Sequence, residues 1–301
     1  MTSFRAILLR HSLRLISLWS RTASLRQLRT FTDAAALFAP AGSLLTPMLA
    51  NGVPIEWIRP AGIPYRSLLF YLHGGTFTLG SSHSHRSLVI RLCQASQAHA
   101  VVVNYRLAPE HPFPAALVDC WHVYHWLLQS GIPAQDIICI GDSAGGNLVL
   151  ALLLALRDAG QPLPGAAVCL SPMTDLTCTG ASYTTHRQRD PLLTPEIVKR
   201  MVTYYLQGHN PHFPFLSPLY GNLEGLPPLL IQVGTEEILL SDALRFAEQA
   251  RVAGVAVQLQ VWQSMWHVWQ SFAPLVPEAQ QAIVEIGAYI ERQRTANIAL
   301  E

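Results

Sequence analysis

Short apolar runs alternate along the chain with longer segments of helix length. The apolar runs are Ser67–Leu72, Val101–Asn104, Ile137–Ile140, Ala166–Leu170, Leu229–Val233 and Val255–Trp262. The middle runs are continuously apolar, which is expected of parallel strands that are buried on both faces. The last run instead alternates apolar and polar residues, a pattern that indicates a half-exposed strand.

The segments between these runs are predicted to be helices. They are Ser82–Gln97, Pro114–Gln129, Asn147–Ala159 and Ser241–Ala253. Gly131, Gly160 and Gly254 follow the last three of these segments, and glycine commonly ends a helix. Strands and helices that alternate in this way predict an open, mostly parallel α/β sheet. In such a sheet, binding and catalytic sites form at the carboxyl ends of the strands.

The composition excludes several classes of protein. Half of the 301 residues are hydrophobic and 13% are charged, whereas disordered chains are poor in apolar residues. The longest unbroken apolar run, Leu148–Leu156, has nine residues, and a membrane-spanning helix needs about 20. The net charge of +1 argues against a nucleic-acid partner, which selects for a strong basic excess. We therefore expect a globular cytoplasmic protein without a membrane span.

The charge is unevenly distributed. Six arginines and no acidic residue precede Asp33, so +1 is the sum of +6 on this segment and 14 − 19 = −5 on the rest. One side of a helical wheel carries Phe4, Ile7, Leu8, Leu15, Leu18 and Trp19, and a flank carries Arg10, Arg14 and Arg21. This pattern favours an amphipathic helix. We expect it to pack on the body or over a pocket; a targeting segment or contact with a membrane surface is the alternative.

Cysteine and histidine patterns do not indicate a metal or a cofactor. The five cysteines are widely spaced in apolar surroundings: Cys93, Cys120, Cys139, Cys169 and Cys178. An odd, scattered set of this kind is typical of small core residues in a reducing compartment. The sequence contains neither a CxxC pair nor an HExxH motif, and its closely spaced histidines lack further ligands at zinc-like spacing.

The first chemistry-bearing motif is Gly-Asp-Ser-Ala-Gly-Gly at Gly141–Gly146, between a predicted strand and a predicted helix. Its glycines permit a sharp, strained turn that exposes the Ser143 hydroxyl above the sheet edge. The helix N-terminus favours negative charge that develops there. The motif therefore predicts a serine nucleophile. A turn that binds an anion or only packs is the alternative.

The second motif is His73-Gly74-Gly75-Thr76-Phe77, directly after the first predicted strand. Consecutive glycines let backbone N–H groups point into one space, which a tetrahedral oxyanion requires. Together with the serine turn, the motif predicts an oxyanion hole in which the Ala144 N–H joins donors from Gly74, Gly75 or Thr76.

A base and an acid must accompany a serine nucleophile. His267 lies in a tryptophan-rich loop after the last predicted strand, from which it can reach Ser143. The chain order of serine, acid and histidine requires a carboxylate between them. Glu236, Glu237 and Asp242 all meet this requirement. Asp242 has the alternative role of capping the helix that follows it.

With these motifs in this order, the chain resembles the bacterial hormone-sensitive-lipase-like esterases of the α/β-hydrolase superfamily. The resemblance runs from about residue 53 to about residue 290 and includes Tyr105–Pro114, Ser171–Thr177 and Pro227–Gly234. It implies an α/β-hydrolase fold: a mostly parallel central sheet with helices on both faces and a helical cap. It also implies that Ser143 is the nucleophile, that His267 is the base, and that Glu237 takes the place of an aspartate used by other members.

One residue departs from the family pattern. Where the family has a third glycine in its HGGG motif, this chain has Thr76. The backbone N–H remains, but a β-branched residue restricts φ and ψ and adds a hydroxyl and a methyl group beside the acyl site. We predict a shifted substrate range without loss of activity.

The resemblance further implies an N-terminal arm with cap helices at residues 1–45 and a catalytic domain at residues 46–301, with a cap insertion at about 180–215. In the insertion, Thr194 and Pro195 mark a helix start. The helix that follows carries Met201, Tyr204 and Tyr205, which are candidates for pocket lining or for cap core.

We expect hydrolysis of short- to medium-chain uncharged esters through an acyl-enzyme, with a small-molecule ester as the only ligand. An amidase or deacetylase with the same triad and a non-catalytic binding module on this fold are the alternatives. By analogy with the family, we also expect a homodimer through an outer strand and the C-terminal helix.

Overall fold

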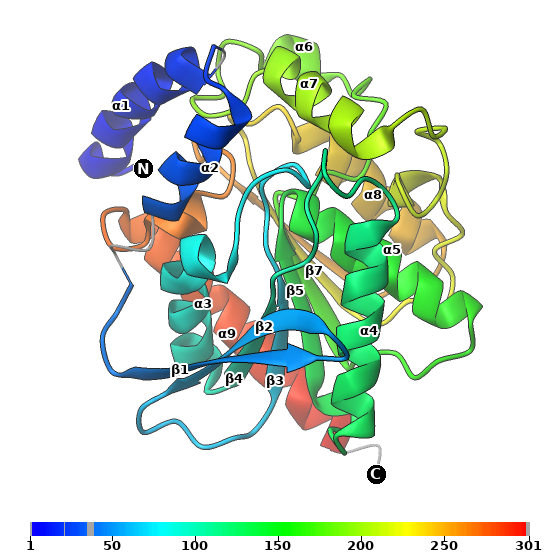
Figure 1. The fold of residues 1–301 in the computed structure, drawn as a ribbon. Coiled ribbons are helices and arrows are strands. Elements are labelled where there is room, and N and C mark those ends of the chain that lie inside the picture. The colour runs from blue at the N-terminus through cyan, green and yellow to red at the C-terminus, as the bar shows by residue number, and fades with distance from the viewer. Residues whose placement is uncertain (1, 21, 35–38, 299–301) are drawn as a thin grey trace.

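Eight strands form one sheet in the computed structural model, which describes residues 2–20, 22–34 and 39–298 (Figure 1). Their order across the sheet is β1-β2-β4-β3-β5-β6-β7-β8. Strand β2 is antiparallel to both of its neighbours, and the other pairs are parallel. The bounds are β1 Ser43–Ala50, β2 Val53–Pro60, β3 Leu68–Leu72, β4 His99–Val103, β5 Ile137–Asp142, β6 Ala166–Leu170, β7 Leu229–Gly234 and β8 Val257–Trp262.

Helices cover both faces of this sheet. The α-helices are α1 Phe4–Ser20, α2 Leu25–Asp33, α3 Ser82–Ser96, α4 Ala115–Gln129, α5 Ala144–Asp158, α6 Ser182–Thr185, α7 Pro195–Leu206, α8 Leu240–Val252 and α9 Pro277–Ile298. Single turns of 3₁₀-helix are η2 Ala134–Asp136, η3 Pro218–Tyr220 and η4 Trp269–Phe272. In Figure 1, α1, α2, α6 and α7 lie together at the top.

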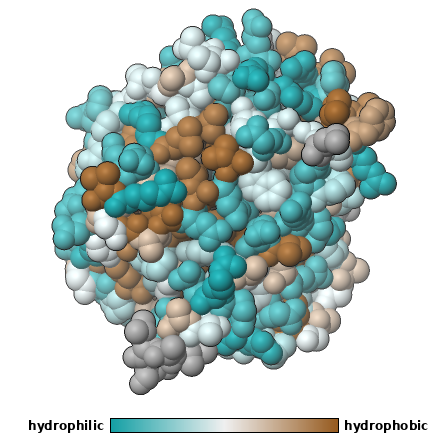
Figure 2. Space-filling view, turned by 180° about the vertical axis from the view of Figure 1, so that it is seen from behind, coloured by the Kyte–Doolittle hydropathy of each residue, from teal (hydrophilic) through white to brown (hydrophobic). Residues whose placement is uncertain are grey.

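Two hydrophobic cores result from the alternation of side chains along the strands. In β3, Leu68, Phe70 and Leu72 face a core shared with α4, α5 and α8. Leu69 and Tyr71 face the other core, shared with α3 and α9. The continuous apolar runs of the inner strands are thus explained by burial on both faces, and the predicted α/β sheet is confirmed. From behind, the surface shows hydrophobic residues gathered mainly on its upper half (Figure 2).

Most predicted elements form close to their expected bounds, with two differences among the strands. The hydrophobic pattern does not predict β1 and β2, because many residues of β1 are exposed and the apolar residues of β2 are interrupted by Glu56 and Arg59. Strand β8 is the sheet edge, and residues of both parities in it are partly exposed. The alternation of apolar and polar residues in β8 therefore does not correspond to one buried and one exposed face of the strand.

The cysteines are buried thiols in the interior of the fold. All five cysteines are buried and free, and burial raises the pKa of the Cys178 thiol to about 12. No helix in the described ranges is long and apolar enough to cross a membrane. Within the same ranges, no group of three or more His, Cys, Asp or Glu side chains is arranged to hold a metal ion.

The N-terminal helices pack on the body, which is the first of the two arrangements expected for this segment. The contact of α1 nevertheless uses the side opposite to the one that carries its large apolar residues. Ala6 and Leu13 are buried in the core of α3 and α9, whereas Phe4 is 78% exposed and Leu15 is 70% exposed. Arg21 lies outside the described residues.

Candidate active site

Ser143 lies in a strained turn between β5 and α5. Its φ and ψ are 53° and −119°, a region that residues other than glycine rarely adopt. The next residue, Ala144, begins α5, so the serine sits at the helix N-terminus. A Cβ atom on Gly145 would collide with the Leu72 carbonyl oxygen at the end of β3. The glycine thus lets the turn approach the neighbouring strand closely, as the motif predicts.

The neighbouring Asp142 ties the glycine loop after β3 to the serine turn. Its buried Oδ1 accepts hydrogen bonds from the Tyr71 hydroxyl (2.7 Å) and from the Gly74 N–H (2.9 Å). The Gly74 N–H is therefore engaged by a carboxylate, which corrects the expectation that it serves an oxyanion. Gly75, Thr76 and Ala144 remain as candidate oxyanion donors.

Two histidines flank this carboxylate. His85 Nε2 lies 3.4 Å from Asp142 Oδ2. Burial opposes protonation of His85, but the charge and hydrogen bond of Asp142 outweigh it and raise its pKa. His73 is stacked on Tyr105 at 4.2 Å and donates from Nδ1 to the Gly74 carbonyl. Burial and His85 lower the pKa of His73 to about 3, so this imidazole is neutral and holds the loop.

The backbone at Thr76 is strained. Its φ is 51° and that of Phe77 is 61°, although β-branched residues strongly avoid this left-handed region. The Thr76 hydroxyl lies 3.2 Å from the Thr78 hydroxyl, whose oxygen is 3.5 Å from the Met201 sulfur of α7. Thr76 thereby connects the candidate oxyanion loop with the segment between β6 and β7.

Of the three candidate acids, Glu237 contacts His267. Its Oε2 accepts a 3.0 Å hydrogen bond from His267 Nδ1. Its Oε1 accepts from the Gly234 N–H (2.6 Å) and the Ser171 hydroxyl (2.9 Å), and the side chain is fully buried. Donation from Nδ1 leaves Nε2 of His267 as the proton acceptor.

The other two carboxylates point elsewhere. Glu236 pairs with Arg10 of α1 at 2.7 Å and with Arg189 at 3.3 Å. Asp242 Oδ2 accepts from the backbone N–H groups of Thr174 and Asp175, at 3.1 Å each. The alternative that Asp242 caps its own helix is wrong, because the N-cap of α8 is Leu239 and has no side-chain cap. Burial, with Asp175 nearby, raises the pKa of Asp242 well above its usual range.

The charge state of His267 follows from opposing effects. Burial disfavours the imidazolium and lowers the pKa. The hydrogen bond and charge of Glu237 outweigh burial, with help from Asp190 and Asp142, so the pKa of His267 is raised above 6.5. The same arrangement stabilises the imidazolium that forms when His267 accepts a proton.

Ser171, after β6, is a site residue that the hydrophobic pattern does not reveal. Its hydroxyl donates to Glu237 and accepts from the Val268 N–H at 3.1 Å, so it joins the acid to the histidine loop. Both Ser171 (φ 47°) and Val268 (φ 48°) have strained backbones. The only signal for this role in the sequence is its place in the Ser171–Thr177 stretch of the family resemblance.

Ser143 and His267 line one cavity of about 270 Å³. Gly75 and Thr76 border it on the oxyanion side, and Thr32 of α2 reaches it from the N-terminal arm. The remaining wall is largely apolar and includes Leu79, Leu192, Leu193, Ile197, Met201, Val268 and Phe272. Elements far apart in sequence thus line one space around the serine and the histidine.

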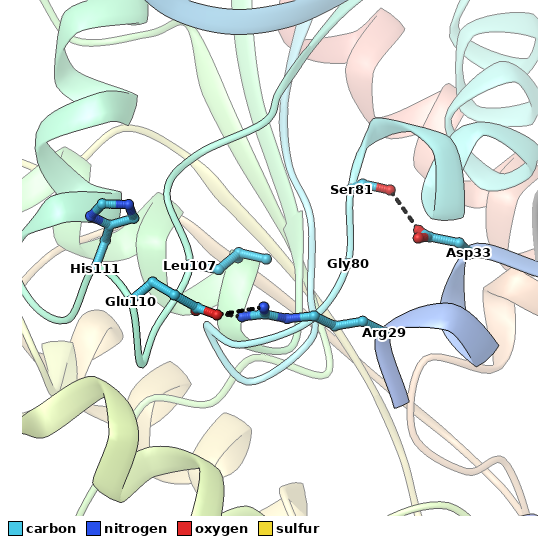
Figure 3. Close-up of a pocket in the computed structure, with 7 residues that line it drawn as sticks. All are labelled: Arg29, Asp33, Gly80, Ser81, Leu107, Glu110 and His111. Atoms are coloured by element: carbon cyan, nitrogen blue, oxygen red, sulfur yellow. Dashed lines mark hydrogen bonds and ion pairs between the residues drawn. The ribbon is translucent and has the colours of Figure 1, made fainter. Parts of the chain in front are cut away.

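A second cavity of about 390 Å³ adjoins the first at Gly80. Figure 3 shows Arg29 of α2 reaching across it to Glu110, while Asp33 at the end of α2 bonds to Ser81. Arg29 also donates to the carbonyl oxygens of Thr78 and Ala108. Its hydrogen bonds lower the pKa of Glu110 to about 2. These paired charges attach α2 to the loops beside the candidate site.

Comparisons with known proteins agree with this geometry. A family model described as an α/β-hydrolase fold matches residues 69–271. The chain is 46% identical to an acetyl-hydrolase of Streptomyces hygroscopicus, over 84% of each chain, and 41% identical to an esterase of Acinetobacter venetianus, over 81% of each. A crystal structure of an esterase from the bacterial hormone-sensitive lipase family matches with a TM-score of 0.92 and 41% identity, over 98% of this chain and 99% of that one. The chain therefore belongs to the bacterial hormone-sensitive-lipase-like esterases of the α/β-hydrolase fold and is a carboxylic ester hydrolase.

Proposed function

We propose that the chain hydrolyses short- to medium-chain uncharged esters through an acyl-enzyme on Ser143. The observation that carries this proposal is the buried His267–Glu237 pair, whose histidine lines the same largely apolar cavity as a serine in a strained turn. A serine hydroxyl is a weak nucleophile at neutral pH and needs such a base.

In the first half of the reaction, Nε2 of His267 takes the proton of the Ser143 hydroxyl as its oxygen attacks the ester carbonyl. His267 then gives this proton to the leaving alcohol, and the acyl group stays on Ser143. Water attacks the acyl-enzyme by the same route, and the acid is released. Throughout, Glu237 keeps the proton of neutral His267 on Nδ1 and stabilises the imidazolium form of His267.

The negative oxygen of each tetrahedral intermediate is held by backbone N–H groups. We assign this role to Gly75, Thr76 and Ala144, since Gly74 donates to Asp142. Ala144 is the first residue of α5, and N–H groups at a helix N-terminus favour an anion. The loss of one such donor lowers the rate by about 10²–10³-fold.

The cavity supports small, uncharged substrates. Its volume of about 270 Å³ lies just below the range of ligand pockets, which is roughly 300–1,000 Å³. The wall is largely apolar, and its charged groups Asp142 and His85 pair with each other, which favours neutral esters over charged ones. The names of the acetyl-hydrolase relatives also support a small acyl group. We assign residues 180–215 and the N-terminal arm to a cap, because Met201 and Thr32 border the cavity.

A substrate panel tests the proposal. Rates are measured for p-nitrophenyl esters from acetate to laurate and for matched anilides, with the wild type, Ser143→Ala and Ser271→Ala. Ser271 lines the same cavity and provides the matched control. We expect short and medium esters to be hydrolysed fastest, Ser143→Ala to lose hydrolysis and Ser271→Ala to retain it.

Three outcomes contradict the proposal. Near-normal hydrolysis by Ser143→Ala excludes the acyl-enzyme on this serine. An anilide hydrolysed faster than its matched ester indicates an amidase or deacetylase. Binding of esters without turnover by the wild type indicates a non-catalytic module.

A further inference from the structure

The outward side of α1 is a mainly apolar strip, in which the exposed His11 is the one titratable side chain. We call it, together with Phe31 of α2, the outer face. Its large side chains are exposed by 78% at Phe4, 45% at Ile7, 59% at Leu8, 70% at Leu15, 56% at Leu18, 38% at Trp19 and 47% at Phe31. Hydrophobic residues are also visible at the upper right of the rear view, on the side where α1 lies (Figure 2). Apolar patches of this kind mark interaction sites on folded proteins.

Burial on the body does not explain the outer face. The opposite side of α1 already packs on the body through Ala6 and Leu13, with Leu9 and Ile16 partly buried beside them. The helix is fixed in this orientation by polar links: Ser3 bonds to Glu278 of α9, and Arg10 to Glu236. The outer face therefore points away from the body while α1 remains docked.

Aromatic and basic residues complete the surface. Trp19 and Phe31 lie with ring centroids 5.3 Å apart and, with Arg26, line a shallow hollow between the two helices. Arg5, Arg14 and Arg26 are exposed beside the apolar strip, and no acidic residue precedes Asp33. Apolar and aromatic side chains flanked by arginine alone are typical of helices that lie in the interface of an anionic membrane.

We propose that the outer face binds an anionic lipid surface, with α1 lying parallel to it. The apolar strip enters the boundary between headgroups and acyl chains, and the flanking arginines pair with lipid phosphates. A second copy of the chain fits less well, because a two-fold contact between outer faces brings arginines against arginines. Binding here requires no movement of α1 and does not depend on the proposed chemistry at Ser143.

Vesicle sedimentation of the full chain tests this proposal. The vesicles contain phosphatidylcholine alone or equal parts of phosphatidylcholine and phosphatidylglycerol. We expect sedimentation with the anionic vesicles, reduced by high salt, and little with the neutral ones. Leu8→Asp/Leu15→Asp should weaken binding at least about 100-fold, because burial of one leucine contributes about 1.5–3 kcal/mol. Arg5→Gln/Arg14→Gln should weaken it by about 10- to 30-fold, at about 1 kcal/mol per arginine.

Matched controls carry the same changes elsewhere. Val252→Asp/Val284→Asp replaces valines of α8 and α9 that are 82% and 54% exposed, and Arg251→Gln/Arg292→Gln removes two exposed arginines. Both controls should sediment like the wild type. All variants should keep their melting temperature and their hydrolysis of soluble p-nitrophenyl butyrate, so a failure here is distinct from a failure of the proposed function.

Three results overturn the proposal. The first is a wild type that does not sediment with anionic vesicles. The second is a Leu8→Asp/Leu15→Asp variant that sediments as well as the wild type. The third is a wild type that is a dimer in solution while this variant is a monomer, which makes the outer face an interface between copies.

Discussion

The loops around the candidate site and the N-terminal arm, α1 and α2, are attached to the same body in contrasting ways. In the loops, buried polar groups satisfy one another: Glu237 alone accepts hydrogen bonds from Gly234, Ser171 and His267. The arm is attached through arginines at partly exposed positions, such as Arg10 and Arg29, and it turns its largest apolar residues to solvent.

This difference has an energetic consequence. In a buried network, the loss of one member leaves a partner without a hydrogen bond in a place that water does not reach, which is strongly unfavourable. A partly exposed ion pair contributes at most about 1 kcal/mol, because water replaces the lost partner. Substitutions of the same kind should therefore have large effects in the loops and small effects in the arm.

The adjacent glutamates give the sharpest contrast. Glu237→Gln puts an amide next to His267 and disturbs its tautomer, and a comparable change in a serine protease lowers kcat by about 10⁴-fold. We expect a loss of about 10³–10⁴-fold in kcat for p-nitrophenyl butyrate. Glu236→Gln, the matched control, should change it less than about threefold, because its partner is Arg10 of the arm. Equal losses of kcat in the two variants would contradict the assignment of Glu237 as the acid that pairs with His267.

Ser171 is expected to act as a positioning residue. Ser171→Ala removes the hydroxyl that joins Glu237 to the Val268 N–H, and hydrogen bonds to charged groups contribute about 1.5–3 kcal/mol. We expect kcat to decrease by about 10- to 100-fold with KM nearly unchanged, measured by steady-state kinetics. Ser182→Ala, a buried serine bonded to Ile238 and Ser241, is the control. A change in KM alone would indicate a role in substrate binding instead.

The pH dependence of kcat/KM tests the His267–Glu237 pair. His267 acts as a base only when neutral, and its pKa is raised above 6.5. Activity should therefore fall as the pH decreases through a value above 6.5, by about tenfold per pH unit below it. Glu237→Gln should move this limb to lower pH. His85→Gln should leave it in place, since His85 pairs with Asp142. If His85→Gln moves this limb and Glu237→Gln does not, the limb reports the titration of His85 and not that of His267.

Thr76 contributes a smaller effect, on substrate range. Its φ of 51° is unfavourable for a β-branched residue, and such strain amounts to about 1–3 kcal/mol. Thr76→Gly should raise the melting temperature or leave it unchanged, and should raise the ratio of octanoate to acetate hydrolysis about two- to tenfold by vacating space beside the acyl group. Thr76→Ser, which removes only the methyl group, should give an intermediate ratio. An unchanged ratio in both variants means that Thr76 does not contact the acyl group.

The smallest effect is expected in the arm. Arg29→Gln removes hydrogen bonds to Glu110, Thr78 and Ala108, at partly exposed positions worth about 1 kcal/mol in total. By calorimetry, the melting temperature should fall by about 2–4 °C. Arg26→Gln, one turn away and exposed, should not change it. A fall of more than about 10 °C would show that the arm is as firmly built into the fold as the loops are.

Local sequence signals predict the inner strands and the serine turn because each depends on residues that are adjacent in the chain. Contacts between residues that are distant in the sequence are harder to predict. Gly74 is expected to serve the oxyanion, but Asp142, 68 residues away, takes its N–H. The choice among Glu236, Glu237 and Asp242 likewise depends on the path of the chain after β7, and only the family resemblance favours Glu237.

The arm shows a different limit of prediction. The helical wheel identifies the apolar side of α1, but not the side that packs. Ala6, Leu9, Leu13 and Ile16 form a second, smaller apolar side, which fits the core of α3 and α9. Packing selects the side whose shape matches the surface beneath it, and shape is not visible in a hydrophobic pattern.

Covalent labelling tests the central claim most directly. The wild type is treated with a p-nitrophenyl alkylphosphonate, an ester analogue that leaves a stable adduct on an activated serine, and the labelled peptide is identified by mass spectrometry. We predict one phosphonyl group per chain, on Ser143, with complete loss of ester hydrolysis and strongly slowed labelling in Glu237→Gln. A label on any other residue, or an unlabelled Ser143 in an enzyme that has lost its activity, would contradict the account.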